Sequence, residues 1–237
     1  MNIVIIQQQV TLADKKANYC NVTKLVENAT QQNPSADVII LPELWSTGYA
    51  LKELDQLASE GGEEEANFLG ELARKHDVWF AGGSVAAKTG QGIVNRAQII
   101  NRQGVLQQTY DKIHLVPMLN EDKYLIAGNS ICIYPIDGIR FGFAICYDIR
   151  FCQFIHKLAL DGAQALIVSA QWPMARVNHW KALLHARAIE NQCYVLAANN
   201  ISSGQTPFGG SSMAVSYTHL TLPTRCHRCR SRWSPYH

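Results

Sequence analysis

Two kinds of hydrophobic pattern alternate along most of the chain. In one, short runs of β-branched and other apolar residues are typical of buried strands; in the other, apolar positions recur at helical spacing. This order predicts one α/β domain in which helices cover a mixed sheet. The predicted strands are 1–8, 36–41, 78–84, 95–101, 105–110, 131–135, 139–145, 165–170 and 194–200. The predicted helices are 15–31, 63–76, 151–161 and 177–191.

The composition is that of a globular protein. Hydrophobic residues make up 47% of the 237 positions and charged residues 17%, which predicts a substantial core and argues against disorder. The longest apolar runs, at 38–41 and 166–170, have the length of strands and not of membrane spans. The sequence MNIVIIQQQV begins a strand at once and carries no basic region or cleavage site. We therefore expect a cytoplasmic protein.

Residues 215–237 break with the pattern before them. They have no sustained strand or helix period, and VSYTHLTLPT and CRSRWSPYH back-translate into the two constant parts of a sequencing adapter. We therefore expect residues 1–214 to form one domain that is incomplete at its C-terminus. Residues 215–237 are expected to be a non-native, adapter-encoded and disordered tail.

This segment also alters the charge and cysteine content. Without its four arginines the net charge of +2 becomes −2, and nothing in residues 1–214 favours nucleic acid as a partner. The five other cysteines are irregularly spaced and fit free thiols rather than a disulfide framework. Cys226 and Cys229 have a C-x-x-C spacing, but a zinc site needs a second pair of ligands and none is nearby in the sequence. We predict no metal.

Three polar residues follow the ends of predicted buried strands. Glu43 follows VIILP, Lys112 follows the strand ending at Tyr110, and Cys146 follows FGFAI. Catalytic groups often occupy strand ends, because the strand fixes the backbone while the side chain enters a cleft. A thiol at the start of a helix is also expected to have a stabilised thiolate. Taken singly, however, a buried inert cysteine and two solvated charges are the commoner interpretation.

Taken together, the motifs resemble the nitrilase superfamily of carbon–nitrogen hydrolases. The resemblance runs from Met1 to about Met213. It implies an α-β-β-α sandwich with a Glu-Lys-Cys triad, here with the C-terminal strands of the family missing. The segments that carry it are LPELWSTGY (41–49), YDKIHLVP (110–117), NEDKYLIAG (120–128), CYDIRF (146–151), SAQWP (169–173), HWKALLHARAIENQCYV (179–195) and GGSSM (209–213).

The resemblance implies a role for each triad residue. Cys146 is the expected nucleophile and Glu43 the expected general base. Lys112 and the backbone N–H of Tyr147 are expected to stabilise the oxyanion. Glu121 is a second carboxylate beside the triad or, alternatively, an exposed residue of a polar loop.

Further residues are candidates for substrate binding. Tyr49 and Trp172 are expected to wall the pocket, although aromatic residues after strands are more often part of the core. Arg150 is a candidate partner for a substrate carboxylate, with a structural role as the alternative. Arg187 and Glu190, three apart on a predicted helix, are expected to form an ordinary ion pair. No cofactor is implied.

These features indicate a hydrolase that cleaves the amide C–N bond of a small carboxylic or 2-oxo acid amide. CYDIRF, the tryptophan–proline pair and HW…ARAIENQ are most similar to the ω-amidase-like branch, whose substrates include 2-oxoglutaramate. A Cys thioester and release of ammonia are then expected. The alternatives are an N-carbamoyl amine amidohydrolase or a nitrilase with the same triad, and a non-catalytic binding member of the family. Beyond a small-molecule amide, we expect no membrane partner and a homo-oligomer in the full-length form.

Overall fold

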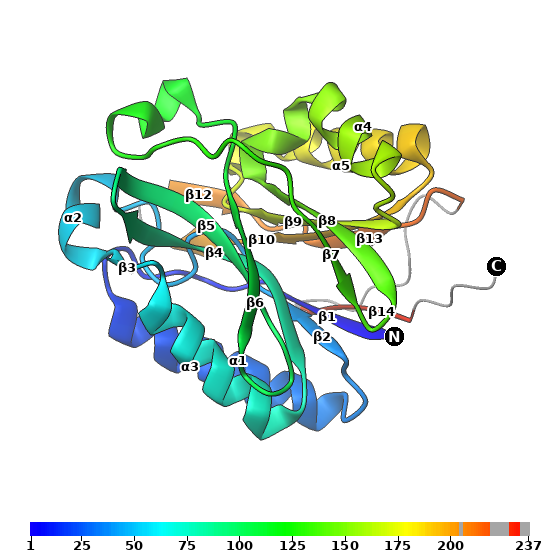
Figure 1. Cartoon of the computed structure of the whole chain (residues 1–237), viewed down its shortest axis with the longest axis horizontal. Coiled ribbons are helices and arrows are strands. Elements are labelled where there is room, and N and C mark those ends of the chain that lie inside the picture. The colour runs from blue at the N-terminus through cyan, green and yellow to red at the C-terminus, as the bar shows by residue number, and fades with distance from the viewer. Residues whose placement is uncertain (204–205, 219–227, 233–237) are drawn as a thin grey trace.

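The computed structural model describes residues 1–203, 206–218 and 228–232 and has four layers. Two β-sheets pack face to face, and a pair of helices covers the outer face of each (Figure 1). The alternation of strand and helix patterns produces this arrangement, because each helix lies between strands of the sheet that it covers. The predicted fold class, an α-β-β-α sandwich, is confirmed.

The first sheet has the order β14-β1-β2-β4-β5-β6, with β3 also beside β4. Strands β1, β2 and β4 run parallel, whereas β5 and β6 follow as antiparallel neighbours. The strands are β1 (Asn2–Ile6), β2 (Val38–Ile40), β3 (Ser59–Glu60), β4 (Trp79–Thr89), β5 (Gly92–Ile100), β6 (Leu106–Asp111) and β14 (Arg228–Arg232).

The second sheet has the order β13-β10-β9-β8-β7. Its central strands β8, β9 and β10 are parallel, and β7 and β13 are antiparallel edge partners. A separate hairpin is formed by β11 and β12. The strands are β7 (Ile133–Ile136), β8 (Ile139–Ile145), β9 (Ala165–Ala170), β10 (Tyr194–Asn199), β11 (Ile201–Ser203), β12 (Thr206–Gly209) and β13 (Met213–Val215).

The helices cover the sheets through apolar faces. Val22 and Val26 of α1 and Leu69 of α3 pack with the outer face of the first sheet, while Leu158 of α4 and Leu184 of α5 belong to the core of the second. The α-helices are α1 (Lys15–Gln32), α2 (Leu54–Leu57), α3 (Glu63–His76), α4 (Cys152–Leu160) and α5 (Val177–Asn191). The short 3₁₀ helices are η1 (Leu51–Glu53), η2 (Pro117–Leu119), η3 (Glu121–Lys123), η4 (Cys146–Arg150) and η5 (Met174–Arg176).

A bulge in β4 brings the two sheets into close contact beneath the site. Gly82 and Gly83 have φ values of +74° and +75°, which favour glycine. A Cβ on Gly82 would lie 2.8 Å from Ile167 Cγ2, and one on Gly83 would lie 2.6 Å from Leu41 Cβ. The bulge therefore requires glycine at both positions, and it turns Ser84 so that its hydroxyl accepts a hydrogen bond from the backbone N–H of Leu44.

The described residues of the segment predicted to be a disordered tail include parts of two strands. Val215 lies in β13, and β14 pairs antiparallel with β1 at the edge of the first sheet (Figure 1). The physical reason is that a sheet edge offers unpaired backbone groups to any extended segment. Cys226 lies outside the described residues, and the domain boundary at residue 214 stays a prediction.

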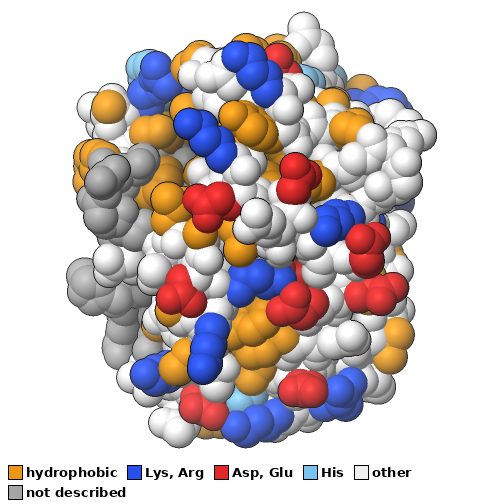
Figure 2. Space-filling model, turned by 90° about the vertical axis from the view of Figure 1, so that its left-hand side faces the viewer, with side chains coloured by type: hydrophobic (Ala, Val, Ile, Leu, Met, Phe, Trp, Pro, Cys, Tyr) orange, Lys and Arg blue, Asp and Glu red, His pale blue; other side chains and the backbone are white. Residues whose placement is uncertain are grey.

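On the side shown in Figure 2, acidic and basic side chains are interspersed with hydrophobic ones. This side of the molecule is therefore not strongly charged. Among the described residues, none of the helices combines the length and hydropathy that crossing a membrane requires.

Candidate active site

The three residues predicted to form a triad meet at the same end of the two sheets. Glu43 follows β2, Lys112 follows β6 and Cys146 follows β8 as the first residue of η4. Glu43 and Lys112 are fully buried, and Cys146 is buried with 5% of its surface exposed. Because the two sheets pack face to face, residues that are far apart in the sequence meet at this site.

The Glu43 carboxylate is held by hydrogen bonds at both oxygens. Oε1 accepts from Lys112 Nζ at 2.9 Å, Asn95 Nδ2 at 2.9 Å and the Tyr49 hydroxyl at 3.1 Å. Oε2 accepts from the backbone N–H of Gln171 at 2.9 Å. These contacts fix the orientation of a side chain that has no contact with bulk water.

Glu121 is a second buried carboxylate at the same lysine. Its Oε1 accepts from Lys112 Nζ at 3.0 Å and from the Tyr49 hydroxyl, and its Oε2 accepts from the backbone N–H of Val116 at 2.8 Å. Burial raises its pKa above the usual value, and the charge on Lys112 opposes this effect. The alternative that Glu121 is an exposed loop residue is wrong, because the turn at η2 and η3 folds it inwards.

Lys112 carries the positive charge of this cluster. Burial alone would lower the pKa of its ammonium group, but the carboxylates of Glu43 and Glu121 raise it above the usual value. The lysine is therefore a permanent cation between two carboxylates. Burial also raises the pKa of the Tyr49 phenol, which stays a neutral hydrogen-bond donor.

Cys146 lies at a sharp turn between β8 and η4, with a φ of +48°. A non-glycine residue with a positive φ is strained, and such strain is often found at active sites. Burial raises the pKa of its thiol well above the usual value, and the neighbouring Glu43 carboxylate adds to this effect. The expectation of a stabilised thiolate at a helix start is wrong, because η4 is a short 3₁₀ turn and burial raises the pKa of the thiol. Reaction at this thiol requires a base.

Asp148 fastens the turn that carries Cys146. Its carboxylate accepts from the backbone N–H of Ile145 at 2.8 Å, the Tyr110 hydroxyl at 2.7 Å and the backbone N–H of His114 at 3.0 Å. The side chain is fully buried. It joins β8, β6 and η4 at one point.

Arg187 holds the other end of η4. Its Nε donates to the carbonyl of Ile149 at 2.9 Å and its Nη2 to the carbonyl of Arg150 at 3.2 Å. The predicted ion pair with Glu190 is confirmed at 2.8 Å. Arg187 therefore does more than form a surface ion pair, since it connects α5 to the turn that carries Cys146.

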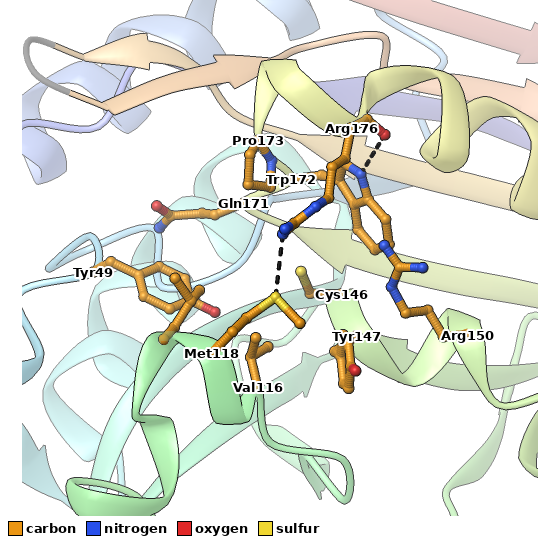
Figure 3. A pocket seen from close by; sticks show the side chains of 11 residues that line it. Tyr49, Val116, Met118, Cys146, Tyr147, Arg150, Gln171, Trp172, Pro173 and Arg176 are labelled. Carbon is orange, nitrogen blue, oxygen red and sulfur yellow. Dashed lines mark hydrogen bonds between the residues drawn. The ribbon is translucent and has the colours of Figure 1, made fainter.

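A pocket of about 420 Å³, including its part open to solvent, leads from the surface to Cys146. Much of this volume is open to solvent, so the enclosed part admits only a small molecule. Figure 3 shows the side chains that surround it. The lining residues are Tyr49, Val116, Met118, Leu119, Cys146, Tyr147, Arg150, Gln171, Trp172, Pro173 and Arg176.

The residues predicted to bind substrate all line this pocket. Tyr49 reaches it with its ring while its hydroxyl contacts the carboxylates below. Trp172 is buried and donates its indole N–H to the Arg176 carbonyl at 2.8 Å. The Arg150 guanidinium lies 4.8 Å from the centre of the Trp172 ring and 5.6 Å from that of Tyr147.

Several residues of the site were missed from the sequence. Asn95 and Gln171 contact Glu43 directly, and Met118 and Arg176 form part of the pocket rim. Asn95 is the first residue of the predicted strand 95–101, and an amide in a strand was a usable signal. Arg176 lies between two predicted elements and gave no such signal. Within the described residues no cluster of three or more His, Cys, Asp or Glu side chains is arranged to hold a metal ion.

The fold and the site define a class of protein. A thiol at a strained strand end, beside a buried carboxylate and a buried lysine, is the arrangement of a cysteine-dependent hydrolase. The model of the carbon–nitrogen hydrolase family matches residues 2–221, and the chain therefore belongs to this family of enzymes.

Relatives agree with this assignment, and a solved structure agrees with the fold. The 2-oxoglutaramate amidase of Bacillus subtilis is 41% identical over 196 residues, which cover 82% of this chain and 76% of the relative. Omega-amidase YafV of Escherichia coli K12 is 36% identical over 203 residues, which cover 86% and 75%. The crystal structure of Saccharomyces cerevisiae Nit3, from branch 10 of the nitrilase superfamily, superposes with a TM-score of 0.91 at 23% identity, covering 99% of this chain and 90% of Nit3.

Proposed function

We propose that this enzyme hydrolyses the amide C–N bond of a small carboxylic or 2-oxo acid amide, of the 2-oxoglutaramate type, through a thioester on Cys146. The observation that carries the proposal is the buried lysine between two carboxylates next to that thiol, at the end of a pocket for a small molecule. The printed names of the amidase relatives support the choice of substrate class.

In the acylation half of the reaction, Glu43 takes the proton of the Cys146 thiol as the sulfur attacks the amide carbon. A base is required because burial keeps the thiol protonated. A C–S bond forms and the carbonyl oxygen takes the negative charge. Glu43 then returns the proton to the amide nitrogen, the C–N bond breaks, and ammonia leaves with the acyl group bound to sulfur.

In the deacylation half, Glu43 activates a water molecule that attacks the thioester carbon. A C–O bond forms, the C–S bond breaks, and the proton held by Glu43 returns to the Cys146 sulfur. The carboxylic acid is released and the free enzyme is restored. The same carboxylate serves both halves because its orientation is fixed by Asn95 and by the backbone of Gln171.

The oxyanion of each tetrahedral intermediate is stabilised by Lys112 and by the backbone N–H of Tyr147. A cation that is already desolvated and oriented needs no reorganisation when negative charge develops. Glu121 is a positioning residue that holds Lys112 through its hydrogen bond at 3.0 Å. Tyr49, Arg150 and Trp172 form the walls that orient the substrate.

The proposal includes a cytoplasmic location and a homo-oligomer of the full-length protein. The described residues include five free cysteines, which a reducing compartment maintains. Leu160 of α4 is 70% exposed and Ile189 of α5 is 50% exposed, and a second copy on this helix layer would cover such apolar side chains. Light scattering measures the oligomeric state of the protein in solution.

Ammonia release and intact mass together test the proposed reaction. We expect ammonia from 2-oxoglutaramate and, in quenched reactions, a mass increase on Cys146 equal to the acyl group. A nitrile and an N-carbamoyl amine serve as competing substrates. Cys146→Ser should give no thioester and lose turnover by about 1,000-fold or more. Equal turnover by Cys146→Ser, or a preference for the nitrile or carbamoyl compound, would contradict the proposal.

A further inference from the structure

His114 lies in the loop between β6 and η2, and its ring contacts the turn η4 that carries Cys146. Its Nδ1 lies 2.7 Å from Oδ1 of Asp148, the same oxygen that accepts from the backbone N–H of His114 at 3.0 Å. The other oxygen of Asp148 accepts from the backbone N–H of Ile145 and from the Tyr110 hydroxyl. The main chain and the side chain of His114 therefore hold one oxygen of the carboxylate that fastens η4.

The contacts of Asp148 decide which nitrogen of His114 carries a hydrogen. The carboxylate already accepts from two backbone N–H groups and one hydroxyl. An ionised carboxylate can only accept, so Nδ1 of His114 carries a hydrogen and donates it. This bond fixes both the tautomer and the orientation of the imidazole ring.

The ring of His114 also packs on the residue that follows η4. It stacks on Phe151, with the ring centroids 3.7 Å apart and the planes inclined by 13°, and it meets Phe154 of α4 edge-on at 5.4 Å. Phe151 in turn contacts the Tyr147 ring edge-on at 5.5 Å. Only 22% of the His114 side chain is exposed. The imidazole therefore contacts the turn through Asp148 and its end through Phe151.

A histidine bonded to an aspartate near a cysteine also resembles the base of a Cys-His-Asp triad. The geometry argues against that role for His114. Among the described residues, those that line the pocket do not include His114, and Glu43 is the carboxylate beside the Cys146 thiol. A ring that is bonded to Asp148 and stacked on Phe151 acts on the sulfur through the turn and not by contact.

We infer that His114 is a positioning residue for Cys146, acting through Asp148. Its Nδ1–H holds the Asp148 carboxylate, and this carboxylate holds the turn that presents the thiol to Glu43. The inference rests on the proposed function, to which it adds a residue outside the pocket. A C–H group and a carboxylate oxygen stay about 3.3 Å apart, whereas the hydrogen bond brings the two groups to 2.7 Å. A phenyl ring at residue 114 would therefore shift η4 by about 0.6 Å.

Two replacements of His114 separate the hydrogen bond from the ring. His114→Phe keeps the stack on Phe151 and removes the donor, whereas His114→Asn keeps a donor at the place of Nδ1 and removes the stack. In His114→Phe we expect kcat for 2-oxoglutaramate to fall about 10-fold with KM near the native value, because His114 does not line the pocket. His114→Asn should keep kcat within about 3-fold of native, and an amide cannot serve as a base. His156→Phe, the same replacement at an exposed hydrogen-bonded histidine of α4, is the matched control and should change neither constant.

Alkylation of the thiol tests the inference without any substrate. The sulfur of a cysteine displaces iodide from iodoacetamide, a C–S bond forms, and the thiol proton passes to a base. Peptide mapping by mass follows each cysteine, and the exposed Cys20 serves as the internal standard. Alkylation of Cys146 should slow about 10-fold in His114→Phe and stay near the native rate in His114→Asn.

The outcome separates this inference from the proposed function. Equal rates in His114→Phe and His114→Asn, whether both are reduced or both native, overturn the inference. If the native enzyme releases ammonia from no amide, the proposed function fails, and the alkylation rates alone decide the role of His114. If circular dichroism shows that His114→Phe does not fold, His114→Gln takes its place. Its amide nitrogen falls at the position of Nε2, so it should show the same loss.

Discussion

Lys112 has a structural role that cannot be separated from its proposed chemical one. It is fully buried and contacts Glu43 at 2.9 Å and Glu121 at 3.0 Å. Two carboxylates in a desolvated site repel each other, and the lysine charge between them offsets this repulsion. The residue proposed to stabilise the oxyanion is therefore also the counter-ion of both carboxylates.

Replacing this lysine should destabilise the fold as well as abolish turnover. In Lys112→Met the free energy of unfolding should fall by about 3 kcal/mol, because two buried carboxylates lose their counter-ion. Denaturant unfolding followed by circular dichroism measures the change. Lys123→Met, at an exposed position of η3, is the control and should unfold like the native protein. Unchanged stability in Lys112→Met would show that the cluster is already neutral.

The positions of Glu43, Lys112 and Cys146 could be predicted because each follows a recognisable strand within a motif. Their surroundings could not be predicted in the same way. Asn95 reaches Glu43 from a neighbouring strand, and this pairing depends on the register of β4, β5 and β6. The direction of the Cys146 pKa shift was also missed, because burial is a property of the assembled sheets and not of the local turn.

Among the elements, the five-residue turn η4 is the one on which the site depends most. It carries Cys146, the proposed nucleophile, in a left-handed backbone conformation and is too short to be stable alone. Its geometry is imposed from outside by Asp148, which joins β8 and β6, and by Arg187 of α5. The sequence motif CYDIRF therefore encodes a turn that is defined by tertiary hydrogen bonds.

Weakening the Asp148 anchor should loosen the nucleophile. Asp148→Asn replaces a charged acceptor of several hydrogen bonds, so the free energy of unfolding should fall by about 2 kcal/mol. The rate constant for turnover should fall because Cys146 is less well placed against Glu43. Thermal unfolding and ammonia release measure the two effects. Asp55→Asn, at an exposed position of α2, is the control. Native activity in Asp148→Asn would contradict the positioning role.

At the scale of the molecule, periodicity predicted the longer strands and helices, but it missed α2, β3 and β11 to β14 and did not assign the strands to two sheets. Helix α3 was predicted with the observed bounds, Glu63–His76, and β9 with Ala165–Ala170. Parallel pairs such as β1 with β2 are joined through a crossover helix, so their partners are set by long-range packing. The pairing of β14 with β1 joins the two ends of the described chain and had no local signal.

Dense packing of the second sheet also buries cysteines away from the site. Burial raises the pKa of Cys132 to about 12, and burial together with Glu190 raises that of Cys193 to about 12, from an ordinary value of 9.0. A group whose pKa is raised on folding contributes stability that is complete below its unfolded pKa and is lost as the pH rises towards the folded value. These thiols therefore make the fold sensitive to alkali from about pH 9 upwards.

The expected result is a fall in unfolding free energy between pH 8 and pH 10 that depends on the buried thiols. Each should contribute a loss of about 1 kcal/mol at pH 10, since the unfolded chain ionises there and the folded chain does not. Urea unfolding at a series of pH values measures this. Cys193→Ala should be less stable than the native protein at pH 8, but its free energy of unfolding should fall less between pH 8 and pH 10. Cys152→Ala, which removes an exposed thiol, should keep the native pH dependence. An identical slope for all three proteins would mean that Cys193 ionises freely in the folded state.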